Sequence, residues 1–192
     1  MEKVADLSEV KPLVIENMKV EEKEAEMELV PPEAFEGFKA YEVTSDDLEQ
    51  LYSLAQEMVK FAHARGGVGL TLPQIGISKR AFVMLDKDDQ WAMMINPEFF
   101  GTGKKVNVYE RSLSYSGVYS VLRYKKINAA YYTLDVDKDD KLVMKKNYRM
   151  LSGLRAFVFQ NLVSILDGKT GRTDGVMIPL KDEKPTEVPQ ES

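Results

Sequence analysis

The stretch S-G-L-R-A-F-V-F-Q-N-L-V-S-I-L-D-G, residues 152–168, decides how this chain folds. Its apolar residues recur at the i, i+3, i+4 spacing of a helix with a buried face, and further apolar side chains widen that face. We therefore expect protein on more than one side of this helix. The apolar positions are Leu154, Phe157, Val158, Phe159, Leu162, Val163, Ile165 and Leu166.

Polar residues mark the ends of this helix and interrupt its apolar face. Ser152 is suited to be the N-cap, and Gly168 follows the last periodic residue, where a left-handed cap is favoured. Asn161 places an uncharged amide on the buried face, where a polar group needs a hydrogen-bond partner. It either caps a neighbouring backbone group or marks a former pocket.

The composition is that of one globular domain. The chain has 192 residues, of which 44% are hydrophobic and 30% are charged. Its net charge of −5 argues against a general nucleic-acid binder. Three lysine pairs, at 104–105, 125–126 and 145–146, are expected to be solvated strand ends and turns. The alternative is a local patch that contacts RNA or an acidic partner.

Cysteine and histidine usage restricts the chemistry. The chain has no cysteine and one histidine, His63. Disulfides and thiolate catalysis are therefore excluded. One histidine cannot supply the several ligands that zinc and iron sites draw from Cys and His, and we predict no metal or cofactor. We expect His63 to lie partly exposed near the end of a helix.

No segment indicates a membrane protein. No apolar run approaches the roughly 18 residues of a membrane helix, and the N-terminal residues lack the pattern of a secretory signal. We expect a cytoplasmic protein with no membrane contact.

The chain begins and ends with weakly patterned segments. Residues 1–38 are acidic, and we expect partial order there, with short strands at residues 14–15 and 27–30. The body of the domain spans residues 39–180. The tail, residues 181–192, is rich in Lys, Glu and Pro and is predicted to be disordered.

Strands fill the middle of the domain. A helix is expected from Thr44, which forms a capping box with Asp47, to about Arg65. The predicted strands cover residues 81–85, 93–95, 106–109, 118–123, 129–136 and 142–144. Asn96-Pro97 should end the second of these strands, and residues 137–140 should form a hairpin turn. One long helix before the strands and one after them indicate the α+β class.

Three stretches, in this order, resemble motifs of the peptide deformylase family. Residues 67–74, G-V-G-L-T-L-P-Q, resemble the family's G-x-G-L-A-A-P-Q. Residues 110–114, E-R-S-L-S, resemble E-G-C-L-S. Residues 160–168, Q-N-L-V-S-I-L-D-G, resemble Q-H-E-x-D-H-L-x-G. Residues 96–97 and 123–127 fit the family's further landmarks, so the resemblance extends over residues 41–180.

The resemblance implies antiparallel sheets packed around the C-terminal helix. It also implies a metal site held by two histidines of that helix and one cysteine, with a glutamate that handles the proton of metal-bound water. Here the ligand positions hold Ser112, Asn161 and Ile165, and the glutamate position holds Leu162. None of these side chains is a good ligand or base. Arg111 replaces a glycine, and its side chain is long enough to fill or bridge the vacated space.

The residues that would bind a substrate are retained. By resemblance, Gln74 and the Leu113 amide would contact a formyl group, and Gly67 and Gly69 would lie beside a peptide. A structural alternative is that Gln74 only holds the turn and that the glycines only permit it.

We favour an inactive deformylase homologue, a pseudoenzyme with a binding, regulatory or structural role and a peptide or protein partner. The alternative is an active deformylase or amidase on formyl-Met peptides that uses relocated ligands, with Glu110, Asp135 and Asp167 as available carboxylates. A third hypothesis is a protein-interaction module that uses the acidic residues 1–38 and the tail, residues 181–192, as its contact elements. The sequence does not indicate the oligomeric state.

Overall fold

The structure, a computed structural model, describes residues 27–86 and 90–179, and these residues form one six-stranded antiparallel sheet. The strand order is β1-β2-β3-β4-β5, and β6 pairs with the first residues of β4. The strands are β1 (Gly69–Thr71), β2 (Ala81–Leu85), β3 (Trp91–Glu110), β4 (Val118–Val136), β5 (Leu142–Ser152) and β6 (Val176–Ile178). Together with the helices, this sheet confirms the α+β class.

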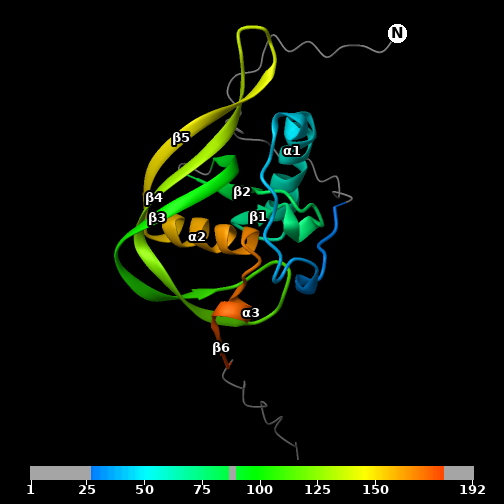
Figure 1. Cartoon of the computed structure of the whole chain (residues 1–192). Coiled ribbons are helices and arrows are strands. Elements are labelled where there is room, and N and C mark those ends of the chain that lie inside the picture. Colours follow the sequence, from blue (N-terminus) through cyan, green and yellow to red (C-terminus); the bar gives the residue numbers. More distant parts are fainter. Residues whose placement is uncertain (1–26, 87–89, 180–192) are drawn as a thin grey trace, which may run out of the picture.

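Two helices cover opposite faces of the sheet. They are α1 (Leu48–Ala64) and α2 (Leu154–Leu166), and strands β3, β4 and β5 bend around α2 (Figure 1). Successive strand residues point to opposite faces, and the cores follow this rule. Phe82 packs in the α2 core, whereas its neighbour Val83 packs in the α1 core. In β4, Tyr131 and Leu134 are divided in the same way.

The ends of α2 agree only in part with the sequence prediction. The predicted N-cap at Ser152 is wrong, because Ser152 is the last residue of β5 and Gly153, at φ 61°, precedes the helix. Leu154 is also not buried, with 72% of its surface exposed. The left-handed Gly168 is confirmed at φ 74°. A Cβ atom there would lie 2.6 Å from the Phe38 nitrogen.

Asn96-Pro97 does not end a strand, which corrects the prediction of a short strand at 93–95. β3 continues to Glu110, because a register shift between Ile95 and Glu98 accommodates the two residues. Asn96 has φ 46°, and its side-chain amide binds both the N–H and the C=O of Val43. The predicted strands at 106–109, 118–123, 129–136 and 142–144 are likewise parts of three longer strands.

The capping box and the end of α1 follow the prediction, although the α-helix itself begins four residues after Thr44. Asp47 Oδ2 accepts a hydrogen bond from the Thr44 N–H at 2.8 Å, as in a capping box, and the helix ends at Ala64. A short 3₁₀ turn, η2 (Ser45–Asp47), precedes it. His63 is exposed in the last turn, as expected.

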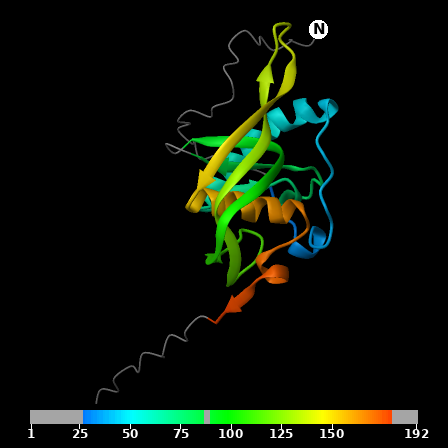
Figure 2. The same ribbon diagram turned by 60° about the vertical axis from the view of Figure 1, so that its left-hand side comes forward.

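The described segments outside the body pack onto it. Residues 27–30 form no strand, contrary to prediction, although Met27 and Leu29 pack against the α1 core. The structure adds elements that the sequence analysis missed, namely η1 (Pro32–Ala34), β1, η3 (Pro73–Ile75), α3 (Gly171–Asp174) and β6. Figure 2 shows α3 and β6 at the end of the molecule opposite the β4–β5 hairpin.

Some predictions fall outside the described residues, including the strand at 14–15 and the tail at 181–192. Within the described part, no helix is long and apolar enough to cross a membrane. The cytoplasmic location remains a prediction.

Candidate functional site

A cavity of about 800 Å³ lies between β1, the loop 111–117, one face of α2 and β6. All of the residues that the resemblance places at a metal or peptide site line it: Gly67, Gly69, Gln74, Arg111, Ser112, Leu113, Asn161, Leu162 and Ile165. The fold therefore brings three distant motifs to one place. That these residues bind a peptide remains a prediction.

Gly69, the first residue of β1, and Gly67 just before it let leucine side chains approach the main chain closely. A Cβ atom at Gly69 would lie 2.6 Å from Leu162 Cδ1, and one at Gly67 would lie 2.9 Å from Leu113 Cδ1. Contacts below about 3 Å are not tolerated in a packed structure, so any larger residue would displace these leucines. The glycines thus define the wall of the cavity.

Gln74 joins β1 to the loop 111–117. The side chain is buried, and its Oε1 accepts hydrogen bonds from the N–H and the hydroxyl of Thr71, at 3.0 and 3.1 Å. Its Nε2 donates to Ser114 Oγ at 3.0 Å. Gln74 therefore has the structural role left open by the sequence, because its amide fixes the turn. This role also orients the amide at the cavity wall.

The loop 111–117 is held from within and from the C-terminal side. Ser112 Oγ accepts a hydrogen bond from the Ser114 N–H at 3.1 Å, and Tyr115 Oη accepts one from the Gly171 N–H at 2.9 Å. Burial raises the pKa of the Tyr115 phenol above its ordinary value, so the phenol stays neutral.

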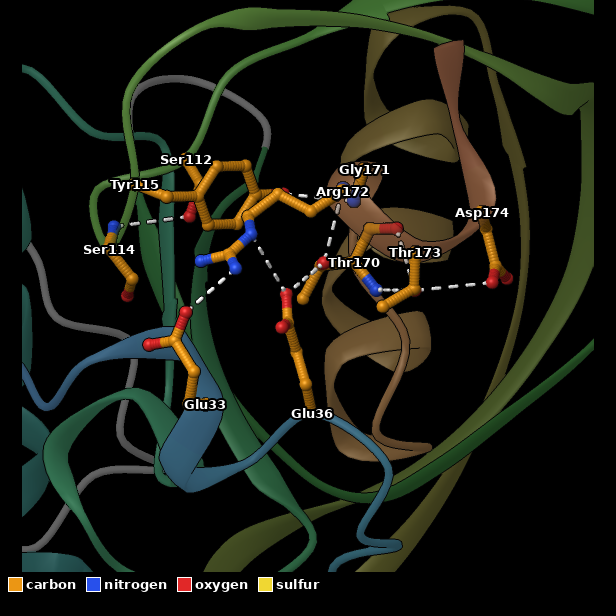
Figure 3. A network of polar contacts seen from close by, with 10 residues as sticks. All are labelled: Glu33, Glu36, Ser112, Ser114, Tyr115, Thr170, Gly171, Arg172, Thr173 and Asp174. Carbon is orange, nitrogen blue, oxygen red and sulfur yellow. Dashed lines mark hydrogen bonds and ion pairs between the residues drawn. The ribbon is translucent and has the colours of Figure 1, made fainter. Parts of the chain in front are cut away.

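The same region is linked to the N-terminal segment by charged groups. In Figure 3, Arg172 lies between two glutamates, with its Nη2 2.7 Å from Glu33 and its Nε 3.6 Å from Glu36. Thr170 Oγ1 donates to Glu36 Oε1 at 2.6 Å. Glu33 and Glu36 thus hold α3 in place, and the hydrogen bond between the Gly171 N–H and Tyr115 connects α3 to the loop 111–117.

Glu110 and Arg123 form a buried ion pair at the cavity. Arg123 donates from Nε and Nη2 to the two carboxylate oxygens of Glu110, at 2.7 and 2.9 Å. Its Nη1 donates to Ser164 Oγ on α2 at 2.8 Å. The geometry is bidentate and holds the end of β3 against the helix. Glu110 is therefore engaged as a structural anion.

The other two carboxylates considered from the sequence are also paired. Asp167 lies 2.6 Å from Arg80 Nη1, and Asp135 lies 3.0 Å from Lys145 Nζ. Neither residue lines the cavity. The structure therefore does not bring the proposed replacement carboxylates together.

The face of α2 toward the cavity is mostly hydrocarbon. Leu162 and Ile165 are buried, with 4% and 2% of their surfaces exposed. Asn161 Oδ1 is buried without a hydrogen-bond partner, the one such side-chain atom in the described residues. The cavity nevertheless remains open. Arg111 is exposed at its edge and so does not fill it.

These residues do not fit a transition-metal ion. Leu162 and Ile165 have no donor atom, and the Ser112 hydroxyl already accepts a bond from the Ser114 N–H. The Asn161 amide is a weak ligand for such ions. No three His, Cys, Asp or Glu side chains gather in the part of the chain that the structure describes.

Sequence reasoning missed two residues that shape the site. Gln160 is buried and bonds both backbone groups of Tyr124, donating to its C=O at 2.8 Å and accepting from its N–H at 2.9 Å. Arg123 pairs with Glu110. Gln160 and Glu110 stand in the motifs quoted above, and Arg123 stands in a landmark, so the signal was present, but only the fold shows their partners.

Comparison with known proteins gives consistent relatives. The family described as polypeptide deformylase matches residues 37–172. A peptide deformylase of Endomicrobium trichonymphae is 34% identical over 106 residues, which span 53% of this chain and 62% of that protein. One of Dictyoglomus thermophilum is 34% identical over 147 residues, which span 76% of this chain and 90% of that protein. The crystal structure of the peptide deformylase from Thermotoga maritima superposes with a TM-score of 0.62 at 28% identity, covering 75% of this chain and 93% of that one.

Proposed function

Because the chain belongs to the polypeptide deformylase family, we propose that it is a catalytically inactive member whose cavity binds a peptide without hydrolysing it. One observation carries the proposal. The positions that resemble the family's metal ligands and general base line the cavity, and they hold Ser112, Asn161, Ile165 and Leu162.

The chemistry of these four side chains supports binding over catalysis. A serine hydroxyl is not a thiolate near neutral pH, and an amide is not an imidazole. Leucine and isoleucine neither coordinate a cation nor move a proton. Burying each of them contributes roughly 1.5–3 kcal/mol to stability, so α2 gains from hydrocarbon at positions where a metal site would place polar groups.

The acid–base groups that a different mechanism would need are engaged elsewhere. Glu110 is held by both nitrogens of Arg123, and the carboxylates of Asp135 and Asp167 pair with Lys145 and Arg80. A carboxylate fixed in a bidentate pair is a poor base, because protonation would leave the guanidinium without its anion.

What remains is suited to holding a peptide. β1 is an edge strand. In its antiparallel ladder the main-chain N–H and C=O of Leu70 point toward β2, so those of the neighbouring Gly69 point to the open edge. Gly69 lines the cavity beside the apolar side chains of α2. A bound peptide would pair its main chain with Gly69 and bury one apolar side chain against Leu162 and Ile165.

The test combines metal content, turnover and binding on the full chain. Protein purified without chelators is analysed for iron, nickel and zinc, and formate release is measured from a formyl-Met tripeptide. We expect substoichiometric metal, no formate, and saturable binding of the peptide in calorimetry. Stoichiometric metal together with formate release would overturn the proposal.

A second candidate is an active deformylase or amidase with relocated ligands, and the names of the relatives favour it. Here Glu110→Gln and Gln74→Leu should abolish a measurable formate release. The matched control is Glu98→Gln, an exposed glutamate of β3 that does not line the cavity. Turnover that is lost only in the cavity variants would support this candidate.

A further inference from the structure

The charged side chains that line the cavity have a net positive charge, whereas the net charge of the whole chain is negative. The net charge is −5, yet the ionisable residues of the lining, tyrosine aside, are Arg65, Arg111 and Glu110. Glu110 is neutralised by Arg123. Within residues 27–86 and 90–179, neither Arg65 nor Arg111 has a carboxylate within ion-pair distance. Two guanidiniums therefore stand uncompensated at one cavity.

Both guanidiniums are available to a ligand. Arg65 and Arg111 are exposed, and Arg65 is steadied by its stacking over the Phe61 ring, with 3.5 Å between Cζ and the ring centroid. Arginine is suited to recognise carboxylates, because its planar fork donates two parallel hydrogen bonds. The chemistry of the edge thus favours an anionic group.

The interior of the cavity determines which chemical groups the remainder of the ligand should have. Phe157, Leu162 and Ile165 offer an apolar surface, and the buried Asn161 Oδ1 needs a donor. An apolar side chain with an adjacent main-chain N–H meets both needs. The open main chain of Gly69 favours a peptide over a fatty acid, because a fatty acid has no backbone to pair with an edge strand.

We propose that the cavity selects acidic peptides: an apolar N-terminal residue enters beside α2, and the carboxylates of the next two residues pair with Arg65 and Arg111. This inference rests on the proposed function, since it concerns the same cavity, and it adds the class of ligand. The selectivity is electrostatic and should therefore weaken as salt is added.

The experiment compares two labelled peptides on the full chain by fluorescence anisotropy. They are formyl-Met-Asp-Glu-Gly and formyl-Met-Lys-Lys-Gly, each with a fluorophore at the C-terminus. We expect the acidic peptide to bind about tenfold more tightly at low salt. The double variant Arg65→Gln/Arg111→Gln should remove that preference. Arg111→Gln alone should reduce the logarithm of the affinity ratio of the two peptides by half.

The matched control is Lys104→Gln/Lys141→Gln, which removes two exposed cations that do not line the cavity. This variant has the same net charge as the double arginine variant and should keep the preference. Equal affinity for the two peptides, or a preference that the control also loses, overturns the inference and leaves the proposed function intact. Release of formate from either peptide overturns the proposed function whichever peptide binds better.

Discussion

The Asn161 side chain is the residue whose environment is least satisfied. Its Oδ1 atom is buried without a donor, and an unsatisfied buried acceptor costs about 1–3 kcal/mol. Asn161→Leu should therefore raise the free energy of unfolding by about 1 kcal/mol, as measured by urea titration. A loss of stability would show that the amide has a partner in the free protein.

Glu110 and Arg123 allow a second test at this scale. Removing one member of a buried pair leaves an uncompensated charge, so Glu110→Gln should cost about 3 kcal/mol. The double variant Glu110→Gln/Arg123→Met should recover part of that loss, since no buried charge is left. Arg123→Met alone completes the cycle. If the double variant loses as much free energy of unfolding as the two single variants lose together, the pair is not coupled in this way.

At the residue scale, the sequence predicts which side chains meet but not what each one bonds. The three motifs predicted the lining of the cavity, because the fold brings all three of them to it. The partner of Gln160 is a backbone group 36 positions away, and no local pattern indicates it. Arg123 is likewise 13 residues from Glu110, across the β3–β4 connection.

Elements were predicted well where periodicity is strong and poorly where a single polar residue redirects the chain. The apolar periodicity of α1 and α2 gave both helices. Three of the four ends were correct to within about two residues, whereas α1 begins at Leu48, after a 3₁₀ turn, and not directly after Thr44. Asn96-Pro97 looks like a strand end, but a register shift accommodates the two residues and β3 continues, while the Asn96 amide bonds the N–H and the C=O of Val43. The hydrogen bonds of Asn96 depend on Val43, a residue 53 positions away, so no local pattern predicts them.

The contact between β1 and α2 gives a prediction at the element scale. Gly69→Ala places a methyl group 2.6 Å from Leu162 Cδ1, and overpacking of this kind costs about 1–3 kcal/mol. In a Leu162→Ala background the space is free, and the same substitution should cost almost nothing. A double-mutant cycle in urea measures the difference. An equal cost in both backgrounds would mean that the backbone of Gly69, not Leu162, sets the requirement.

The start of α1 gives an element-scale prediction about pH. Hydrogen bonds from Lys79 and from the Thr44 N–H lower the pKa of Asp47. A lowered pKa means that Asp47 stabilises the fold above the ordinary aspartate value, about 3.9, and that this contribution is lost as the pH falls through the lowered value. Asp47→Asn should cost about 1 kcal/mol at pH 7 and progressively less below pH 4. A constant difference across thermal melts from pH 7 to pH 2.5 would contradict the assignment.

At the scale of the whole molecule, one sheet carries two cores. The α1 core and the α2 core share every long strand, because neighbouring residues of a strand point into different cores. A disturbance of either core therefore loosens strands that the other core needs. We expect the described domain to unfold as one cooperative unit.

The single tryptophan makes this expectation measurable. Trp91 is buried in the α1 core, whereas Phe159 is fully buried in the α2 core, where its ring packs edge-on against Phe82 with centroids 5.5 Å apart. Phe159→Ala should cost about 3–5 kcal/mol. Although the substitution is on the other side of the sheet, it should shift the urea midpoint of Trp91 fluorescence as much as that of far-UV circular dichroism.

Met58→Ala, in the α1 core, is the matched variant on the side of the tryptophan. It should shift both signals together, by about 2–5 kcal/mol in free energy. If Phe159→Ala moves the circular dichroism midpoint and leaves the Trp91 midpoint in place, the two faces unfold separately. The sheet would then not couple the cavity wall on α2 to the α1 core. Coincident midpoints in both variants would instead mean that packing on α1 contributes directly to keeping the cavity formed.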